Sequence, residues 1–269
     1  MTGLSTKLLR YIGHIFDLTL MLTNNIDILG IPFCTSDDKN VTDRMRHSIS
    51  TRSKLTIGYS HFFHTLLGRN DSALLDLYQK YDIILPDGYG VYIAGRFLYG
   101  KQKAFKKIFN GTDFYNLLLE EANLRRWSLF FLGDTEKVVQ VLKEKVHDVW
   151  PDIRIAGAHH GFIDIVDEEI VSIINQSNAD LLLIGMGTPK QDYWLWEHYY
   201  ELNVPVSIVV GAGIGFISGK KIRAPISLRR IHMEWLFRLF QEPGRLWRRY
   251  LIGIPKFALY IILQKVRQI

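Results

Sequence analysis

The feature that most limits how this chain can fold is the alternation, from residue 26 onward, of short apolar runs with longer segments of helical periodicity. The runs lie at 26–33, 55–59, 81–85, 128–132, 153–158, 181–186 and 206–210. Because they are apolar on consecutive positions and bounded by residues such as Gly, Pro and Asp, they predict strands buried on both faces. A segment such as 134–149, with one apolar stripe, predicts an intervening helix. We therefore expect an α/β fold with a Rossmann-like, doubly wound and mostly parallel sheet.

The formal net charge of +6 is concentrated at the end of the chain. Residues 220–269 hold 12 Lys and Arg against 2 Asp and Glu, whereas the residues before them hold 21 against 25. In this part, 227–241 predicts one amphipathic helix, and a second amphipathic segment follows Pro243 and Gly244. The expected parts are an N-terminal amphipathic segment at 1–25, an α/β catalytic domain at 26–219 and a basic amphipathic helical appendage at 220–269.

Cysteine usage and hydropathy exclude several classes of protein. The single cysteine, Cys34, cannot form an internal disulfide, which excludes a disulfide scaffold or a zinc finger and fits the cytoplasm. The longest apolar windows, 8–22 and 250–263, are interrupted by charged residues or proline and are too short to span a bilayer. We expect no metal or other cofactor, because no carboxylate accompanies the histidine pairs, which are His61 with His64 and His159 with His160.

Asp87 is the first candidate for chemistry, because it directly follows a predicted strand. Ligands of open α/β sheets bind beyond the carboxyl ends of the strands. A partly desolvated carboxylate in such a cleft is suited to act as a general base, and Gly88 and Gly90 would let a ligand approach the backbone. The alternative is an ordinary turn or helix N-cap aspartate.

A second candidate site follows the run 181–186, where Gly185 and Gly187 precede Lys190 and Gln191. Glycines at a strand end, followed by a helix start, direct free backbone N–H groups at an anion such as a diphosphate. The spacing is neither that of a Walker loop nor that of a dinucleotide fingerprint, and the later stretch 211–216 also lacks the third glycine of that fingerprint. A nucleotide-dependent oxidoreductase is therefore disfavoured, while a plain capped helix start is the alternative.

The basic tail interleaves arginines with aromatic residues. These residues are Arg223, Arg229, Arg230, Arg238, Arg245, Arg248 and Arg249, with Trp235, Trp247 and Tyr250. Arginine recognises phosphates through paired hydrogen bonds, and Trp and Tyr favour the interface of a bilayer. We interpret the tail as an interfacial membrane element that also binds a lipid-linked diphosphate. Nucleic-acid binding and a solvated basic helix are the alternatives.

Several stretches, in their order along the chain, resemble the WecG/TagA/CpsF family of bacterial glycosyltransferases. They are Leu85-Pro86-Asp87-Gly88-Tyr89-Gly90, Asn110-Gly111-Thr112-Asp113, Phe131-Leu132-Gly133, Gly185-Met186-Gly187-Thr188-Pro189-Lys190-Gln191, Arg223-Ala224-Pro225, Glu234-Trp235-Leu236-Phe237-Arg238 and Glu242-Pro243-Gly244-Arg245. The resemblance covers about residues 26 to 250 and rests on the combination of motifs.

The resemblance implies an inverting, metal-independent transfer of a sugar from a UDP-sugar to a sugar on undecaprenyl diphosphate, for synthesis of a cell-surface polysaccharide. It places the protein in the cytoplasm, peripheral on the inner face of the cell membrane. The spacing of arginine and tryptophan in the tail favours a lipid diphosphate over nucleic acid as its partner, so we expect no nucleic-acid binding, while a homo-oligomer is left open. It also implies that Asp87 is the catalytic base and Gln191 an active-site glutamine. The substrate-binding residues that it implies are His61, Gly88, Asn110, Asp113, Gly133, Gly185, Gly187, Lys190, Arg223, Arg230, Glu234, Arg238, Arg245 and Arg248.

Two positions depart from the pattern of the family. His61 stands where an asparagine is common, and Gly215 stands where an acidic residue is common. Both positions lie where the resemblance places the site, so the donor can be of N-acetylmannosamine type or of glucose type. An inactive member of the family, with a degenerate site, is the further alternative.

Overall fold

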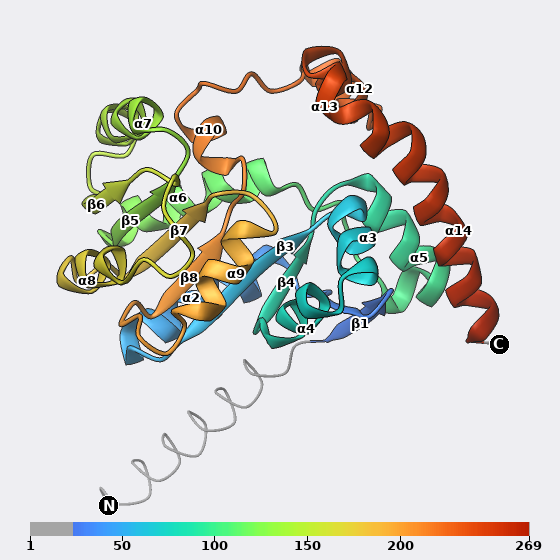
Figure 1. The fold of residues 1–269 in the computed structure, drawn as a ribbon, viewed down its shortest axis with the longest axis horizontal. Coiled ribbons are helices and arrows are strands. Elements are labelled where there is room, and N and C mark those ends of the chain that lie inside the picture. Colours follow the sequence, from blue (N-terminus) through green and yellow to red (C-terminus); the bar gives the residue numbers. More distant parts are fainter. Residues whose placement is uncertain (1–23, 269) are drawn as a thin grey trace, which may run out of the picture.

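The computed structural model describes residues 24–268, so all but the last two residues of the predicted segment 1–25 lie outside the described chain. Its centre is a six-stranded sheet with the order β4-β3-β8-β7-β5-β6 (Figure 1). The strands are β3 (Leu55–Ser60), β4 (Ile83–Pro86), β5 (Ser128–Gly133), β6 (Arg154–His159), β7 (Leu181–Gly185) and β8 (Val206–Val209). All neighbouring pairs are parallel, which confirms the predicted parallel sheet.

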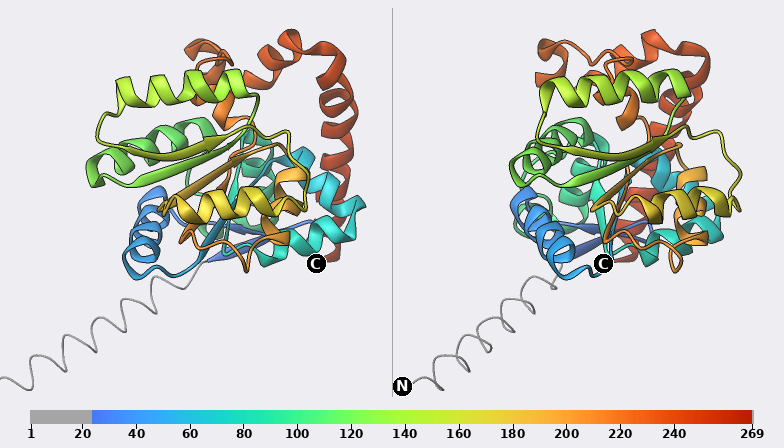
Figure 2. Two further views of the ribbon diagram at one scale, coloured as in Figure 1. Left: turned by 60° about the vertical axis from the view of Figure 1, so that its left-hand side comes forward. Right: turned by 90° about the vertical axis from the view of Figure 1, so that its left-hand side faces the viewer.

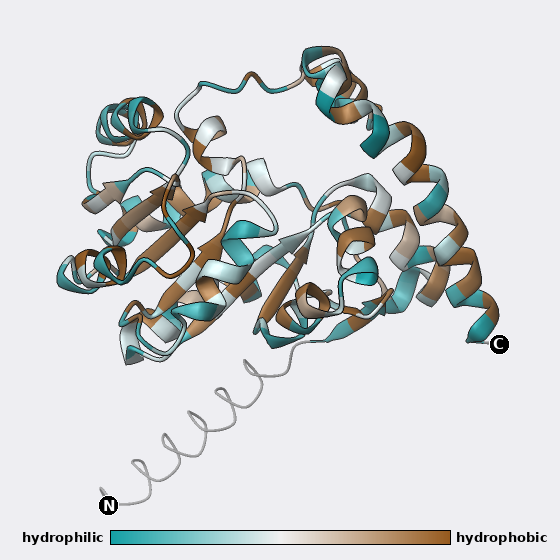
Figure 3. Cartoon of the chain, viewed as in Figure 1, coloured by the Kyte–Doolittle hydropathy of each residue, from teal (hydrophilic) through white to brown (hydrophobic). Residues whose placement is uncertain are grey.

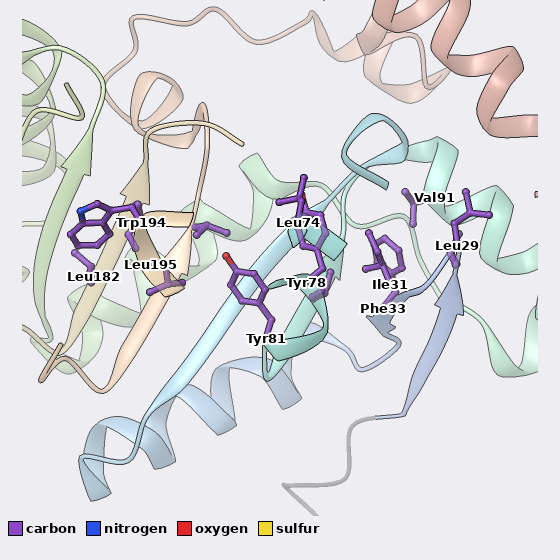
Figure 4. Close-up of a cluster of buried hydrophobic side chains, with 14 of the residues drawn as sticks. Leu29, Ile31, Phe33, Leu74, Tyr78, Tyr81, Val91, Leu182, Trp194 and Leu195 are labelled. Atoms are coloured by element: carbon purple, nitrogen blue, oxygen red, sulfur yellow. The ribbon is translucent and has the colours of Figure 1, made fainter. Parts of the chain in front are cut away.

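Helices cover both faces of this sheet, as the doubly wound prediction requires. One apolar cluster joins the sheet to α2 (Asp38–Thr51), α6 (Gly111–Arg125), α7 (Glu136–Val149) and α10 (Gly213–Ile217). The other cluster joins it to α3 (Phe62–Asn70), α4 (Ser72–Lys80), α5 (Tyr89–Lys103), α8 (Glu168–Gln176) and α9 (Lys190–Glu197). Successive strand residues enter opposite clusters, as Leu129 and Phe130 do, because side chains alternate along a strand. Figure 2 shows the two helical layers, and Figure 4 shows part of the second cluster.

The first apolar run is not a strand of the main sheet, and here the prediction was wrong. Residues 26–33 contribute to an antiparallel hairpin of β1 (Asn25–Ile28) and β2 (Ile31–Cys34), which forms a separate two-stranded sheet. The turn residues Leu29 and Gly30 have φ of 55° and 91°. Two positive φ values in a two-residue loop are typical of the tight hairpin turn that follows the twist of its strands.

The C-terminal part is helical, as predicted, but it contains more breaks than expected. Its elements are α11 (Ile226–Arg230), α12 (Glu234–Gln241), α13 (Pro243–Trp247), a π-helical turn η1 (Arg248–Ile252) and α14 (Gly253–Arg267). The predicted single helix at 227–241 is therefore two helices, separated at 231–233, where His232 has a φ of 60°. A left-handed residue at this place ends the first helix, since few side chains adopt that conformation within a helix.

Helix α14 lies along α3 and α5 in all the views (Figures 1 and 2). Its Phe257 and Ile261 are buried in the second cluster. Near its end, Gln264 accepts a hydrogen bond from Leu29 N at 3.0 Å and donates to the carbonyl and carboxylate of Asp27 at 3.1 and 3.0 Å. Between residues 24 and 268, no helix is long and apolar enough to cross a bilayer.

Candidate active site

The carboxyl ends of five parallel strands meet at one edge of the sheet, where they surround a cavity of about 810 Å³. His61 follows β3, Asp87 follows β4, Asp134 follows β5, Gly185 ends β7 and Gly211 lies beyond β8. Residues of α12, α13 and η1 complete its wall. The predicted site residues that line this cavity are His61, Asp87, Asn110, Gly185, Gly187, Lys190, Gln191, Arg238 and Arg245.

A second cavity, of about 760 Å³, lies between α5 and the C-terminal helices. The predicted site residues that line it are His61, Asp87, Gly88, Asn110, Asp113, Arg223, Glu234 and Arg238. Asp87 lies where the two cavities meet, together with His61, Asn110, Arg238, Arg249 and Tyr250, which line both. The carboxylate can therefore contact molecules that enter from either side.

Asp87 is held by the backbone of two neighbouring segments. Its N–H donates to Ser60 O at 2.9 Å, and its Oδ1 accepts from Gly111 N at 3.0 Å. Among the described residues, no group hydrogen-bonds to Oδ2, which leaves this oxygen available to a ligand. Burial raises the pKa of Asp87, although the Gly111 N–H and the guanidinium of Arg238 oppose the increase. A half-buried carboxylate with a raised pKa and one unoccupied oxygen is suited to accept a proton.

Gln191 ties two strand-end loops together and is itself buried. Its Oε1 accepts hydrogen bonds from Gly187 N and Gly211 N, both at 3.1 Å, and its Nε2 donates to Thr188 Oγ1 at 3.2 Å. These three hydrogen bonds hold together the loops that follow β7 and β8, and the second N–H of Nε2 has no hydrogen-bond partner among the described residues. This geometry assigns Gln191 a positioning role at the cavity wall, and its predicted part in catalysis stays a prediction.

The glycines of the site differ in what they do. Gly88 and Gly187 each have a φ of 84°, a conformation that favours glycine, and a Cβ at either position would meet no atom within 4 Å. Gly133 lines neither cavity: a Cβ there would lie 2.5 Å from the backbone of Gly185. Gly133 therefore allows β5 and β7 to end in close contact. Lys190, at the start of α9, donates to Gly161 O at 3.1 Å.

His61 caps α3 and also contacts the C-terminal part of the chain. Its Nδ1 accepts hydrogen bonds from Phe63 N and His64 N, at 3.1 and 3.4 Å, and its Nε2 lies against the guanidinium of Arg249. The imidazole of His64 lies against that of His61, with ring centroids 3.7 Å apart and the ring planes tilted by 30°. Burial and the nearby Arg249 lower the pKa of His61 well below its ordinary value and the pKa of His64 to about 3. Both rings are therefore neutral at physiological pH.

Hydrogen bonds connect the tail with α6. Arg238 Nη2 donates to Glu234 Oε1 at 2.9 Å, and Glu234 Oε2 accepts from Asn110 Nδ2 at 3.2 Å. Although burial opposes it, the carboxylates of Glu234 and Asp87 raise the pKa of Arg238. Arg223 forms a two-pronged pair with Asp113, which lowers the pKa of that carboxyl. Because its pKa is raised, the guanidinium of Arg238 stays charged, and it lies close to Asp87.

Some predicted residues lie outside the site, and some residues that line it are not among the substrate-binding residues that the resemblance implies. Arg230 and Arg248 are exposed and line neither cavity. Arg249 lines both cavities, and its spacing of four from Arg245 is a signal that places the two on one helix face. Asp134 and Lys220 also line the first cavity, and Lys220 Nζ donates a hydrogen bond to Asp134 Oδ1 at 2.8 Å.

At Gly215, where the family commonly has an acidic residue, the carboxylate of Asp134 lies close to the backbone. A Cβ at this position would lie 3.3 Å from Asp134 Oδ2 and 3.2 Å from Lys221 Cγ. An acidic side chain at 215 would therefore approach the Asp134 carboxylate, which already occupies this place. Within residues 24–268, no cluster of three or more His, Cys, Asp and Glu side chains could hold a metal ion.

Comparison with known proteins identifies the family. The model of the glycosyl transferase WecG/TagA/CpsF family matches residues 26–269. The chain belongs to the WecG/TagA/CpsF family. It is 30% identical to the N-acetylglucosaminyldiphosphoundecaprenol N-acetyl-beta-D-mannosaminyltransferases of Staphylococcus aureus strains MW2 and NCTC 8325, over 92% of this chain and 95% of each relative. This WecG/TagA/CpsF protein is a glycosyltransferase, and the cavities described above are lined by Asp87 and by five tail arginines, which are Arg223, Arg229, Arg238, Arg245 and Arg249.

Proposed function

We propose that this protein transfers a sugar from a UDP-sugar, with inversion and without a metal ion, to a sugar carried on undecaprenyl diphosphate. The observation that carries the proposal is the position of Asp87 at the junction of two cavities, with one carboxylate oxygen unoccupied. One cavity suits the donor and the other the acceptor. The names of the relatives support both the lipid-linked acceptor and a β-linked product. A β product from an α-linked nucleotide sugar requires inversion at the anomeric carbon.

In the proposed reaction, the acceptor hydroxyl oxygen attacks the anomeric carbon of the donor. The bond from that carbon to the diphosphate oxygen breaks, and its electron pair leaves with UDP. The hydroxyl proton passes to Asp87 Oδ2, since Oδ1 already accepts from Gly111 N. Asp87 must therefore be ionised before the transfer, and the proton later returns to solvent.

The donor diphosphate is proposed to bind in the cavity that the loops after β7 and β8 enclose. Support comes from the glycine loop at 185–187 and from positive side chains at the same wall, Lys190 and Arg245. Positive charge and N–H groups at this place would stabilise the departing UDP, whose negative charge increases in the transition state. In this proposal, these groups supply the positive charge that a divalent cation would otherwise provide.

Association with the cytoplasmic face of a membrane is part of the proposal. Support comes from apolar side chains on α14 that are more than half exposed and share one stripe, Leu259, Ile262 and Val266, of which Ile262 also lines the second cavity, and from the exposed Arg248. An amphipathic helix with exposed arginines binds anionic interfaces through apolar insertion and charge attraction. A peripheral position would bring the cavities to a lipid-linked acceptor.

The experiment that tests the proposal is turnover of the full chain with a panel of UDP-sugars and a polyprenyl-diphosphate-linked N-acetylglucosamine, with and without EDTA. We expect one donor, of N-acetylmannosamine or glucose type, to give a β-linked product at a rate that EDTA does not change. An α-linked product or full inhibition by EDTA would contradict the mechanism. Failure of every donor and acceptor pair would instead favour an inactive member of the family.

A further inference from the structure

The cavity next to α5 has an apolar wall that no part of the described chain covers. On α5, Tyr89, Ile93 and Phe97 follow each other at intervals of four residues and are 43%, 46% and 51% exposed. On α14, Ile254, Ala258 and Ile262 repeat the same spacing and line the same cavity. Figure 3 shows the apolar segments of these two neighbouring helices. We call the space between the two helices the α5–α14 groove.

Both helices start at the active site and run away from it side by side. Helix α5 begins two residues after Asp87, and α14 begins four residues after Arg249. At the other end, Lys265 Nζ donates to Leu98 O at 2.7 Å and Gln268 Nε2 donates to Tyr99 Oη at 3.1 Å. Phe97 lies eight positions after Tyr89, which corresponds to roughly 12 Å along the groove. The groove is therefore a straight apolar path that leads from Asp87.

The end of the α5–α14 groove at the active site has an excess of positive charge. Four arginines line the cavity from the segments that precede α14, and they are Arg223, Arg229, Arg238 and Arg249. Arg223 and Arg238 pair with Asp113 and Glu234, whereas Arg229 and Arg249 form no ion pair within the described residues. His232 stacks on Tyr89, with ring centroids 4.4 Å apart, and joins the turn after α11 to the first apolar side chain of the groove. A ligand that fits both ends carries an anionic group followed by a linear apolar chain.

We propose that the α5–α14 groove binds the first isoprene units of the acceptor's polyprenyl chain, with the acceptor diphosphate at the arginines near Asp87. This inference rests on the proposed function and adds a subsite to it. Continuity with the cavity around Asp87 favours the acceptor's own lipid over any separate partner. An apolar surface of this kind, left uncovered beside a charged site, is typical of a binding groove.

Such a subsite makes the enzyme selective for acceptors with long lipid tails. A tail that enters the groove fixes the distance between the isoprene units and the diphosphate, and therefore holds the acceptor sugar beside Asp87. An acceptor whose tail is too short to reach Phe97 lacks these apolar contacts, and its sugar is held less firmly beside Asp87. The selectivity arises in the protein itself and does not depend on a bilayer.

The test compares two detergent-solubilised acceptors that share one sugar diphosphate and carry either a polyprenyl chain or a short alkyl chain. For the wild type, kcat/KM is expected to be higher with the polyprenyl acceptor. In Phe97→Asp and in Ile262→Asp, the ratio of the two kcat/KM values should fall by about ten-fold or more, because a carboxylate is costly in an apolar contact. The matched control is Val141→Asp on α7, where the valine is 42% exposed and distant from the groove. An unchanged ratio in both groove variants would overturn the proposal.

A binding measurement separates this inference from the proposed function. Calorimetry should show that the wild type binds geranylgeranyl diphosphate at least about ten-fold more tightly than inorganic diphosphate, and that Phe97→Asp loses the preference. This result would support the groove even if no donor gave turnover, in which case only the proposed function fails. Equal affinity of the wild type for the two compounds, as expected if another segment fills the groove, would overturn the inference.

Discussion

Arg223 and Asp113 form two parallel hydrogen bonds, from Nη1 to Oδ1 at 2.6 Å and from Nη2 to Oδ2 at 2.9 Å. Arg223 precedes α11, and Asp113 lies in the first turn of α6. The pair therefore connects the C-terminal helices with the α/β body at the basic end of the α5–α14 groove. The side chain of Arg223 is 20% exposed and that of Asp113 is 63% exposed, so the contribution of the pair to stability is limited by solvent.

Asp113→Asn should affect the acceptor more than the fold. We expect the free energy of unfolding to fall by less than about 1 kcal/mol, because the pair is partly exposed. The KM for the acceptor should rise while the KM for the donor stays constant, since the tail arginines lose one attachment. Asp152→Asn, which affects the exposed pair with Arg126, is the control. Equal KM values in the variant and the wild type would argue against this role.

His61→Ala should lose the cap of α3, whereas His61→Asn should keep it. The alanine removes the acceptor of the Phe63 and His64 N–H groups, which is expected to cost about 1 kcal/mol of stability, while asparagine is itself a good N-cap residue. Chemical denaturation of both variants measures the difference. Destabilisation of His61→Asn as large as that of His61→Ala would show that the contact with Arg249 matters more than the cap.

Stability should depend on pH through Asp192, a buried residue of α9. Burial raises the pKa of Asp192 to about 6, and its Oδ1 accepts from Tyr81 Oη at 2.9 Å. Because the folded-state pKa exceeds the unfolded value, the folded state favours the protonated form, and stability falls as pH rises from about 4 to about 6. The ionised form therefore costs roughly 3 kcal/mol at neutral pH.

Urea denaturation of the wild type and Asp192→Asn at several pH values tests this prediction. Asparagine does not titrate, so the difference in unfolding free energy between the two proteins should change between pH 4 and pH 6 and stay constant above about pH 7. Groups common to both proteins cancel in this difference. A difference that is independent of pH would show that Asp192 has an ordinary pKa.

The exposed stripe of α14 should control binding to membranes. In Leu259→Asp combined with Val266→Asp, binding to vesicles that contain anionic lipid should fall by about ten-fold or more, since each change removes apolar insertion and adds repulsion. Cosedimentation measures the bound fraction. Val141→Asp combined with Val149→Asp, on the exposed face of α7, is the matched control. Unchanged binding of the α14 variant would assign the interface to another surface.

The main sheet was predictable because each of its strands lies in a mostly apolar run with turn-forming neighbours. The hairpin was not, since β1 and β2 read as one run at 26–33, and only Gly30 marks the turn between them. Periodicity does not distinguish one buried strand from two short ones joined by a tight turn. The loop residues Asp87, Gly185 and Gly187 were predictable for the same reason as the sheet, because parallel strands end at one edge.

The arginines of the site were harder to predict, because their direction depends on the phase of each helix. The break at 231–233 separates α11 from α12, and η1 contains a π-helical turn. A π-helical turn holds more residues than an α-helical one and shifts the direction of later side chains. Arg249 lines both cavities, whereas Arg248 next to it is exposed. Neither the break nor the wider turn has a clear signal in local sequence.

The pH dependence of turnover should reflect the position of Asp87. Burial raises the pKa of Asp87, so the ionised base is lost as pH falls through a value higher than the pKa of an exposed aspartate. The acidic limb of kcat/KM should therefore lie at a higher pH than that of an exposed carboxylate.

The central claim, that Asp87 accepts the proton of the acceptor, is tested most directly by the kcat of Asp87→Asn. We expect kcat to fall by about 100- to 10,000-fold, with an unchanged Kd for UDP. The free energy of unfolding should be unchanged or higher, because burial disfavours the ionised carboxylate that the asparagine replaces. Turnover close to that of the wild type, in a variant that folds and binds UDP, would contradict the assignment of Asp87 as the base.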